Sequence, residues 1–521
     1  MEADMARPGQ VVVIGAGIGG LASAVLLAAR GVAVTLVEKD AHAGGKVRRQ
    51  EVGGVAVDAG PTVFTCKDVF EAFFAEAGAD LSQRCTIRQA DLVARHAWSA
   101  SERLDLFADP RRSEDAIGEF AGAEAARGYR AFRTEAQRIH DILDQSFMRN
   151  SRVYPPMLMW RIGLWRLGAL RAIRPYESLW SALGGHFRDP RLQQLFGRYS
   201  TYCGSSPFRA PATLMLIAHV EAMGVWLIEG GLSALAEALA QLAREQGARL
   251  RFGEAVSEIL VERGRAAGVR LESGEVIRAD SVIANADPAA IASGAFGRAG
   301  RGGVRAVPPK RRSLSAMTWL VKAKTGGFPL DRHNVFFSPD YRAEFAALEQ
   351  GQLARNPTAY VCAIDRPGDA PADGERLQII VNAPANGDTH PYGPKESDAC
   401  GAAMWERLSR CGLTVEPLAE PLVTTPADFA GRFPSTGGAL YGRASHGWAA
   451  SFLRQSARTR IPGLYCAGGS THPGAGVPMA ALSGRLAAGQ VLKDLASTRT
   501  FRPVAMPGGM SMPSPTAVPS G

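Results

Sequence analysis

VVVIGAGIGGLASAVLLAARGVAVTLVE, which spans residues 11–38, decides the fold of this chain. Its first four residues are all β-branched, as is typical of a parallel strand that is covered on both faces. A glycine turn follows, and then an alanine-rich run that predicts a helix able to approach a sheet closely. Gly31 ends that helix, and residues 32–37 predict a second buried strand. The stretch therefore predicts the strand–helix–strand unit of a Rossmann-like α/β fold.

The turn carries Gly15, Gly17 and Gly20 in GxGxxG spacing. In a dinucleotide-binding turn, the first glycine permits the tight bend and the second lets the backbone approach a diphosphate. The third allows the helix to pack on the strand. Free N–H groups at the start of the helix favour the negative charge of the diphosphate. The alternative is a glycine-rich turn in an ordinary α/β core, and the ordered strand, helix, strand and acid favour the nucleotide site.

The acid is Glu38, which closes the second strand 18 residues after Gly20. A carboxylate at this place accepts hydrogen bonds from the ribose of an adenosine. It would also repel a 2′-phosphate, so the residue disfavours NADP. FAD and NAD both remain as candidate cofactors.

The hydrophobic fraction of 46% describes a soluble globular protein. Its 521 residues are too many for one hydrophobic core and predict at least two domains. The net charge of +9 suits an anionic membrane surface, a nucleic acid or simple solubility. Nucleic acid is the weakest of the three, since residues 310–312 form the only dense basic run. We predict no nucleic-acid partner.

Cysteine and histidine spacing predicts neither disulfides nor a metal site. The seven cysteines are scattered and contain no CxxC pair, which favours reduced thiols and a cytoplasmic setting. The nine histidines show no HExxH or comparable spacing. The N-terminus predicts no signal peptide, and no run of 18 uncharged apolar residues predicts a transmembrane helix.

Two short elements after Glu38 carry a resemblance to a known family. They are the GGK sequence at residues 44–46 and the DAGPT sequence at residues 58–62. Together with the opening unit, they resemble the FAD domain of the flavin amine oxidase and phytoene desaturase superfamily. The resemblance implies FAD contacts from Lys39, Gly45, Lys46, Gly60, Pro61 and Thr62. Arginine is usual at position 46, and lysine keeps the charge but lacks the bidentate fork.

The end of the chain resembles the family more specifically. Residues 468–478 read GGSTHPGAGVP, which is similar to the signature of bacterial carotenoid desaturases. The resemblance implies that this stretch walls the flavin through Gly468, Gly469, Val477, Pro478 and Met479, and that the backbone at Val256 contacts the adenine. Many relatives have an acid at position 469. Glycine stands there in this chain, so backbone groups would have to hold the ribityl chain.

The resemblance implies an FAD-binding domain of the glutathione reductase and amine oxidase type. We expect it to comprise residues 10–80, 230–290 and 456–496, with strand, turn, strand, turn, strand over residues 249–286. An inserted α+β substrate domain would take residues 81–229 and 291–455. Residues 64–208 predict mainly helix, with segments at 68–77, 123–143 and 190–199. Strands are expected at 316–321, 360–363 and 377–382, and a disordered tail at 497–521.

One helical segment has an unusual composition. Residues 154–178 (YPPMLMWRIGLWRLGALRAIRPYES) mix tryptophans 160 and 165 with arginines 161, 166, 171 and 174. The arginines do not share one helical face, but tryptophan and arginine together are typical of a segment at a membrane interface. We expect peripheral contact with the inner, chromatophore membrane. The alternative is a helix that lines the substrate cavity.

Within the family, the chain most resembles the 1-hydroxycarotenoid 3,4-desaturases of purple bacteria. The matching stretches are residues 60–65 (GPTVFT), 202–207 (YCGSSP), 211–221 (PATLMLIAHVE), 333–337 (HNVFF) and 438–442 (GALYG). Polar groups beside apolar stretches make Tyr202, Ser205, Ser206 and His219 candidates for substrate binding, although core packing also explains each of them. No residue stands out as a catalytic base.

The sequence contains no second GxGxxG for a nicotinamide cofactor, so the flavin would be reduced by the substrate and reoxidised by oxygen or a quinone. Flavin N5 would accept a hydride from an allylic carbon, and a proton would leave the neighbouring carbon. One alternative is phytoene desaturase or another carotenoid oxidoreductase, such as a saturase or isomerase. Another is a prenyl-binding escort protein similar to the GDP-dissociation inhibitors, and the intact glycine sets argue against it.

Overall fold

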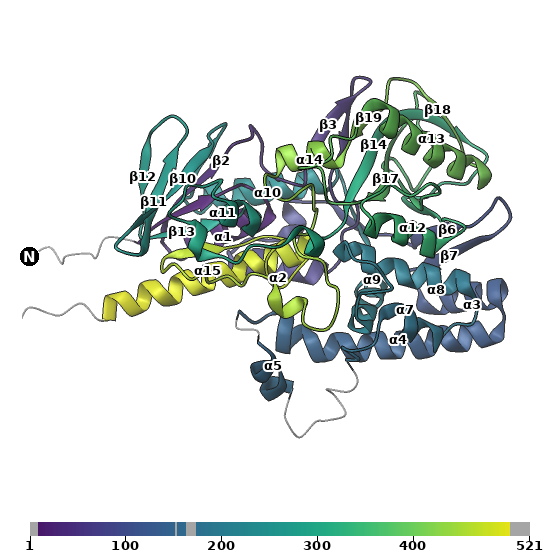
Figure 1. Cartoon of the computed structure of the whole chain (residues 1–521), viewed down its shortest axis with the longest axis horizontal. Coiled ribbons are helices and arrows are strands. Elements are labelled where there is room, and N and C mark those ends of the chain that lie inside the picture. Colours follow the sequence, from purple (N-terminus) through teal and green to yellow (C-terminus); the bar gives the residue numbers. More distant parts are fainter. Residues whose placement is uncertain (1–8, 152–153, 163–172, 501–521) are drawn as a thin grey trace, which may run out of the picture.

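The computed structural model describes residues 9–151, 154–162 and 173–500 (Figure 1). A five-stranded parallel sheet forms around the opening stretch, in the order β20–β13–β1–β2–β9. Its strands come from distant parts of the chain: β1 (Gln10–Ile14), β2 (Ala33–Glu38), β9 (Arg249–Phe252), β13 (Ser281–Ala284) and β20 (Leu464–Cys466). The predicted Rossmann-like unit is confirmed, because β1 and β2 pair in parallel with α1 (Ile18–Ala28) between them in sequence.

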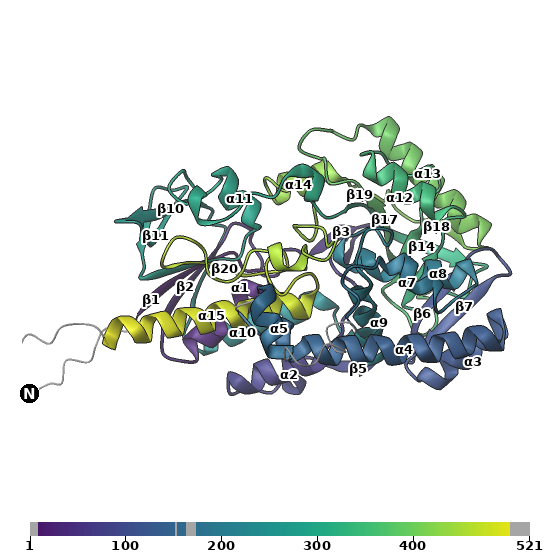
Figure 2. The same cartoon turned by 60° about the horizontal axis from the view of Figure 1, so that its bottom comes forward.

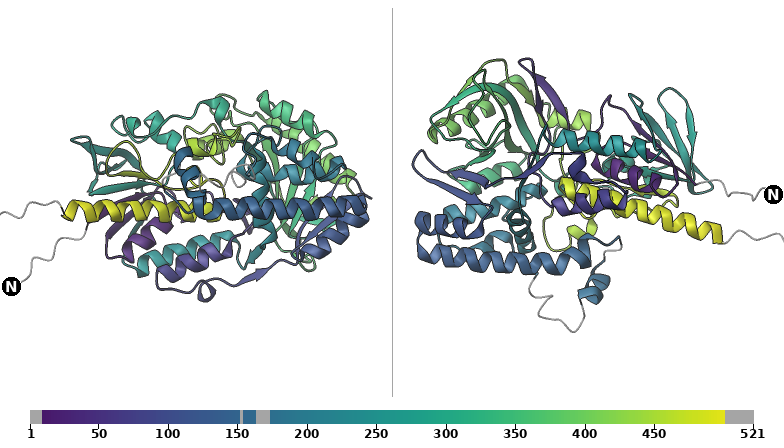
Figure 3. Two further views of the ribbon diagram at one scale, coloured as in Figure 1. Left: turned by 90° about the horizontal axis from the view of Figure 1, so that it is seen from below. Right: turned by 180° about the vertical axis from the view of Figure 1, so that it is seen from behind.

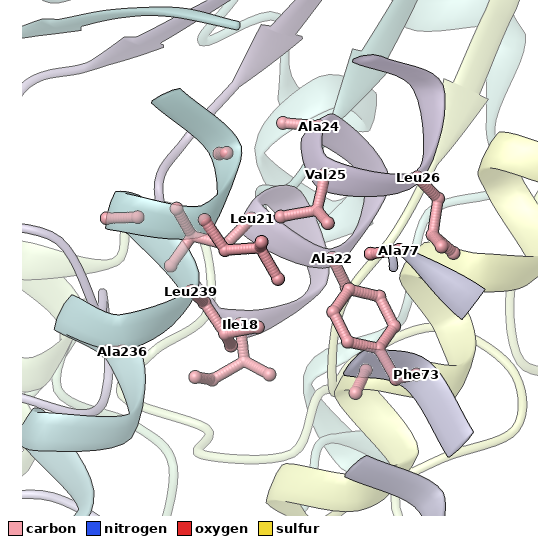
Figure 4. Packing of buried hydrophobic residues seen from close by; sticks show 14 of the residues in the cluster. Ile18, Leu21, Ala22, Ala24, Val25, Leu26, Phe73, Ala77, Ala236 and Leu239 are labelled. Atoms are coloured by element: carbon pink, nitrogen blue, oxygen red, sulfur yellow. The ribbon is translucent and has the colours of Figure 1, made fainter. Parts of the chain in front are cut away.

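Helix α1 is the centre of the packing beside the parallel sheet (Figure 4). All eleven of its residues are buried, between α10 (Leu232–Glu245), α2 (Lys67–Glu76) and α15 (Val477–Thr500). Small residues permit this contact, since a Cβ added at Gly484 of α15 would lie 2.2 Å from the Gly19 carbonyl oxygen. The Ser23 hydroxyl joins the two helices by donating to the carbonyls of Gly19 and Gly484.

The return segment contains more strands than the pattern predicts. Residues 249–286 form five strands, not three: β9 and β13 join the parallel sheet, while β10 (Val256–Glu262), β11 (Arg265–Leu271) and β12 (Val276–Arg278) form a separate antiparallel sheet. Tight glycine turns cause the difference. Gly253, Gly264 and Gly274 all have positive φ, so the chain reverses within two or three residues where the sequence suggests continuous strands.

A second, mixed sheet lies at the right of Figure 1. Its order is β18–β14–β17–β16–β15–β6–β7, and β19 also pairs with β14. The strands are β6 (Leu92–Ala97), β7 (Arg103–Phe107), β14 (Ser315–Gly326), β15 (His333–Phe336), β16 (Ala359–Ala363), β17 (Glu375–Ala383), β18 (Thr414–Pro417) and β19 (Leu422–Thr424). The strands predicted at 316–321, 360–363 and 377–382 are confirmed within β14, β16 and β17.

Helices cover the mixed sheet on one side (Figures 1 and 2). They include α3 (Pro110–Ala121), α4 (Ala123–Leu143), α7 (Leu179–Gly184), α8 (Pro190–Gly197) and α9 (Leu216–Ala222). The prediction that residues 64–208 are mainly helical is wrong at β6 and β7, which pair across a turn and extend the sheet by parallel contact with β15. In β7 the buried positions alternate, and the surrounding helical patterns hide that short period.

Figure 3 shows α15 and α4 as two long helices that follow one another along the same face, with α5 (Pro155–Ile162) beside them. Helix α15 continues to Thr500, so residues 497–500 of the predicted tail are helical, and its remaining residues, 501–521, lie outside the described residues. Among the described helices, none is long and apolar enough to cross a bilayer. The remaining elements are β3 (Arg49–Val52), β4 (Val55–Asp58), β5 (Ile87–Gln89), β8 (Trp226–Ile228), α11 (Pro288–Ser293), α12 (Tyr341–Glu349), α13 (Pro394–Arg410) and α14 (Pro426–Arg432).

Candidate active site

A cavity of about 810 Å³ extends between the parallel and the mixed sheets. One end is lined by the glycine turn after β1 and by the end of β2. The other end reaches β14, β16 and β17 of the mixed sheet, together with residues of α4, α5 and α9. Elements that are hundreds of residues apart therefore enclose one continuous space.

Glycines shape the end of the cavity beside the parallel sheet. Gly15 has a φ of +94° and Gly44 a φ of +124°, a conformation that side chains rarely adopt. Gly17 lies against Gly44 through a backbone bridge, and both line the cavity. Gly20 does not line it. A Cβ at Gly20 would lie 2.0 Å from the Gly15 carbonyl oxygen, so that glycine permits close packing of α1.

Two helices begin at this end of the cavity. Ile18 and Gly19 of α1 line it, and so do Val477, Pro478 and Met479 of α15. Neither helix has an acidic residue in its first turn, and Gly17 caps α1 without a side-chain hydrogen bond. The first N–H groups of both helices therefore favour an anionic group in the cavity.

Glu38 lies at the edge of this cradle and is buried. Its Oε2 accepts from the Ala16 N–H at 2.6 Å, and its Oε1 accepts from the Asp40 N–H at 2.9 Å. Burial raises the pKa of the carboxyl, and the two backbone hydrogen bonds oppose that shift. Each oxygen retains a second lone pair for a ribose hydroxyl. Lys39 and Val256 also line the cavity.

The cation predicted at position 46 faces the same space. Lys46 donates to the Leu440 carbonyl, lies 5.2 Å from the Phe433 ring centroid, and lines the cavity with Gly45. Burial lowers the pKa of its ammonium group. The Lys46 ammonium group therefore lies among an aromatic ring and a carbonyl. An anionic ligand would offset the cost of burying its charge.

Sequence reasoning missed a second cation, Arg454, because it belongs to no recognisable motif. Its guanidinium donates to the carbonyls of Tyr441 at 2.8 Å and Arg443 at 2.7 Å. The side chain is buried and lines the cavity, and burial lowers the pKa of its guanidinium. Lys46 and Arg454 therefore contribute two positive charges to the wall of the cavity.

The DAGPT turn connects the glycine cradle to the mixed sheet. Gly60, Pro61 and Thr62 all line the cavity, and a Cβ at Gly60 would lie 2.1 Å from the Lys46 carbonyl oxygen. On the other side, the Thr62 hydroxyl accepts from the Tyr360 hydroxyl at 2.7 Å. Burial lowers the pKa of His333 to about 3, and its Nδ1 lies 2.7 Å from the Tyr360 hydroxyl oxygen. Because that hydroxyl donates its hydrogen to Thr62, the neutral His333 ring donates in this contact.

The C-terminal glycine segment closes the cavity wall. Gly468 has a φ of +119°, and its carbonyl accepts from the Thr471 hydroxyl at 2.6 Å. Gly468 and Gly469 line the cavity with the first turn of α15. Because position 469 lacks a carboxylate, the polar groups available there are backbone N–H and C=O groups.

The part of the cavity beyond the DAGPT turn is lined mainly by apolar side chains. They include Leu143, Phe147, Met148, Leu158, Ile173, Leu214, Ile217, Val220, Trp448 and Phe452. Trp448 is 45% exposed and also lines the cavity. The space suits a long hydrocarbon that enters from outside the protein.

A polar cluster interrupts this apolar wall. Arg198, Tyr202 and Glu221 all line the cavity. The Tyr202 hydroxyl accepts from Arg198 Nη1 at 3.3 Å and donates to Glu221 Oε1 at 2.9 Å. Tyr199 donates to the other carboxylate oxygen. The matching stretches 202–207 and 211–221 bring Tyr202 and Glu221 together, but their pairing with Arg198 gave no signal in the sequence.

The other candidates for substrate binding lie outside the cavity wall. Ser205 accepts from the Ser445 N–H at 2.9 Å, and the backbone N–H of Ser206 donates to His446 at 3.0 Å. Both serines are buried. His219 faces away from the cavity and lies beside His140, with ring centroids 4.9 Å apart. Of the four residues, only Tyr202 lines the cavity.

His219 also belongs to a group that the linear spacing did not reveal. Ligand atoms of His140, Asp141 and His219 lie within 4.8 Å of one another. Two come from α4 and one from α9, so no short motif contains them. Exposed groups of this kind are common without a bound ion, and the cluster lies apart from the cavity.

Comparison with known proteins assigns the family. The family of flavin-containing amine oxidoreductases matches residues 18–492. The chain belongs to this family. It is 52% identical to the hydroxyneurosporene desaturase of Rubrivivax gelatinosus, over 99% of both chains. It is 45% identical to the protein of that name from Cereibacter sphaeroides, over 94% of this chain and 98% of the other.

A solved structure shares the fold at low sequence identity. The crystal structure of an oxidoreductase from Methanosarcina mazei has a TM-score of 0.59 and 18% identity, covering 93% of this chain and all of the other. As a member of the flavin-containing family, the chain is a flavin-dependent oxidoreductase. Its glycine cradle, two helix N-termini and two cations fit an anionic dinucleotide, because the first residues of α1 and α15 line the same cavity as Lys46 and Arg454. Gly17 leaves no room for a side chain of its own, since a Cβ there would lie 2.6 Å from Asn285 Oδ1.

Proposed function

We propose that the protein is an FAD-dependent desaturase that introduces the 3,4 double bond into acyclic 1-hydroxycarotenoids of the hydroxyneurosporene type. The observation that carries the proposal is one continuous cavity, which has a glycine cradle suited to a dinucleotide at one end and a long apolar section at the other. Relatives named hydroxyneurosporene desaturase, with up to 52% identity over nearly the whole chain, support the substrate class.

The cofactor proposed is FAD, held through its adenosine and diphosphate by the elements described above. Glu38 and the backbone at Val256 would contact the adenosine, the turns at Gly15, Gly17 and Gly45 the diphosphate, and the segments at 60–62 and 468–479 the flavin. When bound, the flavin supplies a two-electron acceptor for a hydride from the substrate. All of these groups belong to the proposed FAD-binding domain, which comprises residues 10–80, 230–290 and 456–496. The proposed substrate domain comprises residues 81–229 and 291–455.

The chain's own residues bind, orient and shield the substrate. The apolar wall holds a polyene chain and excludes water, which favours one fixed placement of the reacting carbons beside the cofactor. The substrate loses a hydride from one carbon and a proton from its neighbour, so that a single bond becomes a double bond. Oxygen or a membrane quinone would then take up the two electrons from the reduced cofactor.

The proposal is tested by one conversion. Purified, flavin-loaded protein is mixed with 1-hydroxyneurosporene and a quinone without oxygen, and the products are identified by mass and absorption. We expect a product that has lost two hydrogens and absorbs at longer wavelength, with parallel reactions in air measuring the oxygen-dependent rate. Failure to convert this carotenoid with either acceptor would contradict the proposed activity, and a colourless protein free of flavin would favour the escort alternative.

We also propose peripheral association with the membrane that contains the substrate. Six exposed apolar side chains belong to or adjoin segments that line the apolar part of the cavity, and we call them the apolar collar: Tyr154, Met159, Trp160, Tyr176, Trp448 and Leu453. Trp160 is 65% exposed on α5, whose Leu158 lines the cavity. Tyr176 contacts Trp448, with ring centroids 5.8 Å apart. Residues 163–172 of the tryptophan- and arginine-rich segment lie outside the described residues.

Replacement of two collar tryptophans should weaken binding to lipid. In the variant Trp160→Ser/Trp448→Ser, we expect liposome co-sedimentation to fall at least about tenfold, which corresponds to a loss of only about 1.4 kcal/mol. Flavin content should be retained, because neither residue belongs to the glycine cradle. Liposomes should contain anionic and neutral lipids, in keeping with the net charge of +9.

The matched control is Leu418→Ser/Leu422→Ser. These leucines are 44% and 36% exposed beside β18 and in β19, on the opposite side of the molecule from α5 (Figures 1 and 3). Their replacement should leave lipid binding unchanged. Equal binding by the tryptophan variant and the wild-type protein would show that the collar is not the membrane contact.

A further inference from the structure

The polar cluster of Arg198, Tyr202 and Glu221 is an unusual feature of a cavity proposed to hold a hydrocarbon. Arg198 lies in the 3-10 helix Arg198–Cys203 that follows α8. Its guanidinium lies 5.3 Å from the ring centroid of Tyr202 and 5.2 Å from that of Tyr360. Among the described residues, it forms no ion pair within 4 Å, and its hydrogen bond goes to the Tyr202 hydroxyl.

The guanidinium therefore has donors left for a ligand. A guanidinium carries five N–H donors, and one of these is used within the protein. The remaining surface of Arg198 faces the cavity that the residue lines. A charged donor group enclosed by aromatic rings, with most of its hydrogen bonds unmade, favours a polar atom in the adjacent space.

Glu221 supplies the complementary acceptor. The residue is 5% exposed, and its two oxygens accept from the hydroxyls of Tyr199 and Tyr202. Burial raises the pKa of the carboxyl, while the two tyrosine hydrogen bonds and the charge of Arg198 oppose that shift. Each carboxylate oxygen can accept a further hydrogen bond. Arg198 and Glu221 together offer a donor and an acceptor, the pair that an alcohol requires.

The cluster lies where the two parts of the cavity meet. Arg198 stacks on Tyr360, and the Tyr360 hydroxyl donates to Thr62 at 2.7 Å. Thr62 belongs to the turn whose Gly60 packs against the Lys46 carbonyl on the nucleotide side. One ring and one hydrogen bond therefore separate Arg198 from the cofactor-facing turn.

The chemistry of the proposed substrate requires a polar group in this location. The carbon that bears the hydroxyl in a 1-hydroxycarotenoid is two bonds from C3, the nearer carbon of the bond to be oxidised. A group that binds the hydroxyl must therefore lie beside the reacting carbons, at the cofactor end of the apolar section. A polar contact at the distant, exposed end of the cavity could not serve this purpose.

We infer that Arg198 and Glu221 bind the C1 hydroxyl of the substrate and thereby determine which carbon–carbon bond faces the cofactor. The hydroxyl oxygen accepts from the Arg198 guanidinium, and its O–H donates to Glu221. Tyr202 holds the two side chains in place. This inference rests on the proposed function and assigns recognition of the substrate hydroxyl to Arg198 and Glu221.

The test compares two substrates that differ in the hydroxyl, 1-hydroxyneurosporene and neurosporene, in wild-type protein and Arg198→Met. Methionine keeps an unbranched side chain and removes the donors. We expect kcat/KM for the hydroxylated carotenoid to fall about 10- to 100-fold. The value for neurosporene should change less than about threefold, so the preference disappears. Arg198→Lys should restore part of the preference.

Glu221→Gln provides an independent variant that keeps the shape of the side chain, and it should also reduce the preference. Its matched control is Glu344→Gln, at a buried carboxylate that accepts from Thr358 but does not line the cavity. This control should retain the wild-type preference. Flavin absorbance of every variant measures whether the cofactor site is intact.

Equal losses for both substrates, or an unchanged preference in Arg198→Met and Glu221→Gln, would overturn the inference. Equilibrium binding of the two carotenoids, followed by their absorption shift, gives the same comparison without turnover. If wild-type protein binds the hydroxylated carotenoid more tightly but fails to oxidise it, the proposed activity is wrong while the hydroxyl site stands. If it binds the two equally, the hydroxyl site is wrong even where both are oxidised.

Discussion

Gly17→Val is expected to yield a folded protein without flavin. Gly17 precedes α1 with a φ of −69° and a ψ of 169°, extended backbone that valine adopts without strain. A Cβ there would lie 2.6 Å from Asn285 Oδ1, in the space between the α1 N-terminus and the loop at Gly44. The branched side chain would occupy the proposed diphosphate position. We expect flavin affinity to fall more than about 100-fold, equivalent to about 2.7 kcal/mol.

The same substitution at Gly489 is a matched control. Gly489 lies in α15, and a Cβ added there meets no atom within 4 Å. Valine in the helix should cost less than about 1 kcal/mol, so Gly489→Val should retain flavin. Visible absorbance of the purified proteins, normalised to protein concentration, measures occupancy. Full flavin absorbance and activity in Gly17→Val would show that the diphosphate does not pass over this turn.

The second large effect is substrate selection by the wild-type protein. We expect efficient conversion of 1-hydroxyneurosporene and essentially none of phytoene, with a ratio of kcat/KM above about 100. An apolar pocket discriminates weakly against a missing methylene, whereas a site built to hydrogen-bond a hydroxyl strongly rejects the analogue that lacks it. In this protein, a hydrocarbon end would leave the remaining donors of Arg198 and the remaining acceptor sites of Glu221 without a hydrogen-bond partner from the substrate. Each buried group left unpaired costs about 1–3 kcal/mol.

The measurement presents both carotenoids, singly and in competition, to the same flavin-loaded preparation with a quinone acceptor. Products are separated and identified by mass. Efficient turnover of phytoene, with no preference for the hydroxylated chain, would contradict the assignment to 1-hydroxycarotenoids. The protein would then remain a flavin-dependent carotenoid desaturase of another specificity, because the glycine cradle does not depend on the hydroxyl.

Local patterns predicted the elements whose chemistry is contained in a few consecutive residues. Gly15, Gly17 and Gly20 encode a turn and a close helix contact within one short stretch, and the helix at residues 123–143 was predicted with the bounds of α4. The C-terminal glycines were recognisable for the same reason. Each of these features depends on backbone conformation or on spacing along the chain, which a single sequence contains.

Features that depend on long-range pairing were not predictable in this way. Strands β6 and β7 lie among helices in sequence, and β15, the parallel partner of β6, follows more than 200 residues later. Arg198 gave no signal because its role depends on aromatic rings from β16 and its own 3-10 helix. Arg454 is bound by carbonyls alone and carries no motif. Only the folded arrangement shows what these side chains contact.

The interleaved strand order also constrains how the polypeptide can be made. The parallel sheet begins with β1 at residue 10, and its last strand in sequence is β20 at residues 464–466. In the mixed sheet, β6 can pair with β15 only after residues 333–336 have been synthesised. Neither sheet can be completed until most of the chain has left the ribosome, so open strand edges persist throughout synthesis. Chaperone supply and cellular flavin should therefore limit soluble yield, and a chain that ends before Leu464 should aggregate because β13 has no neighbour on that edge.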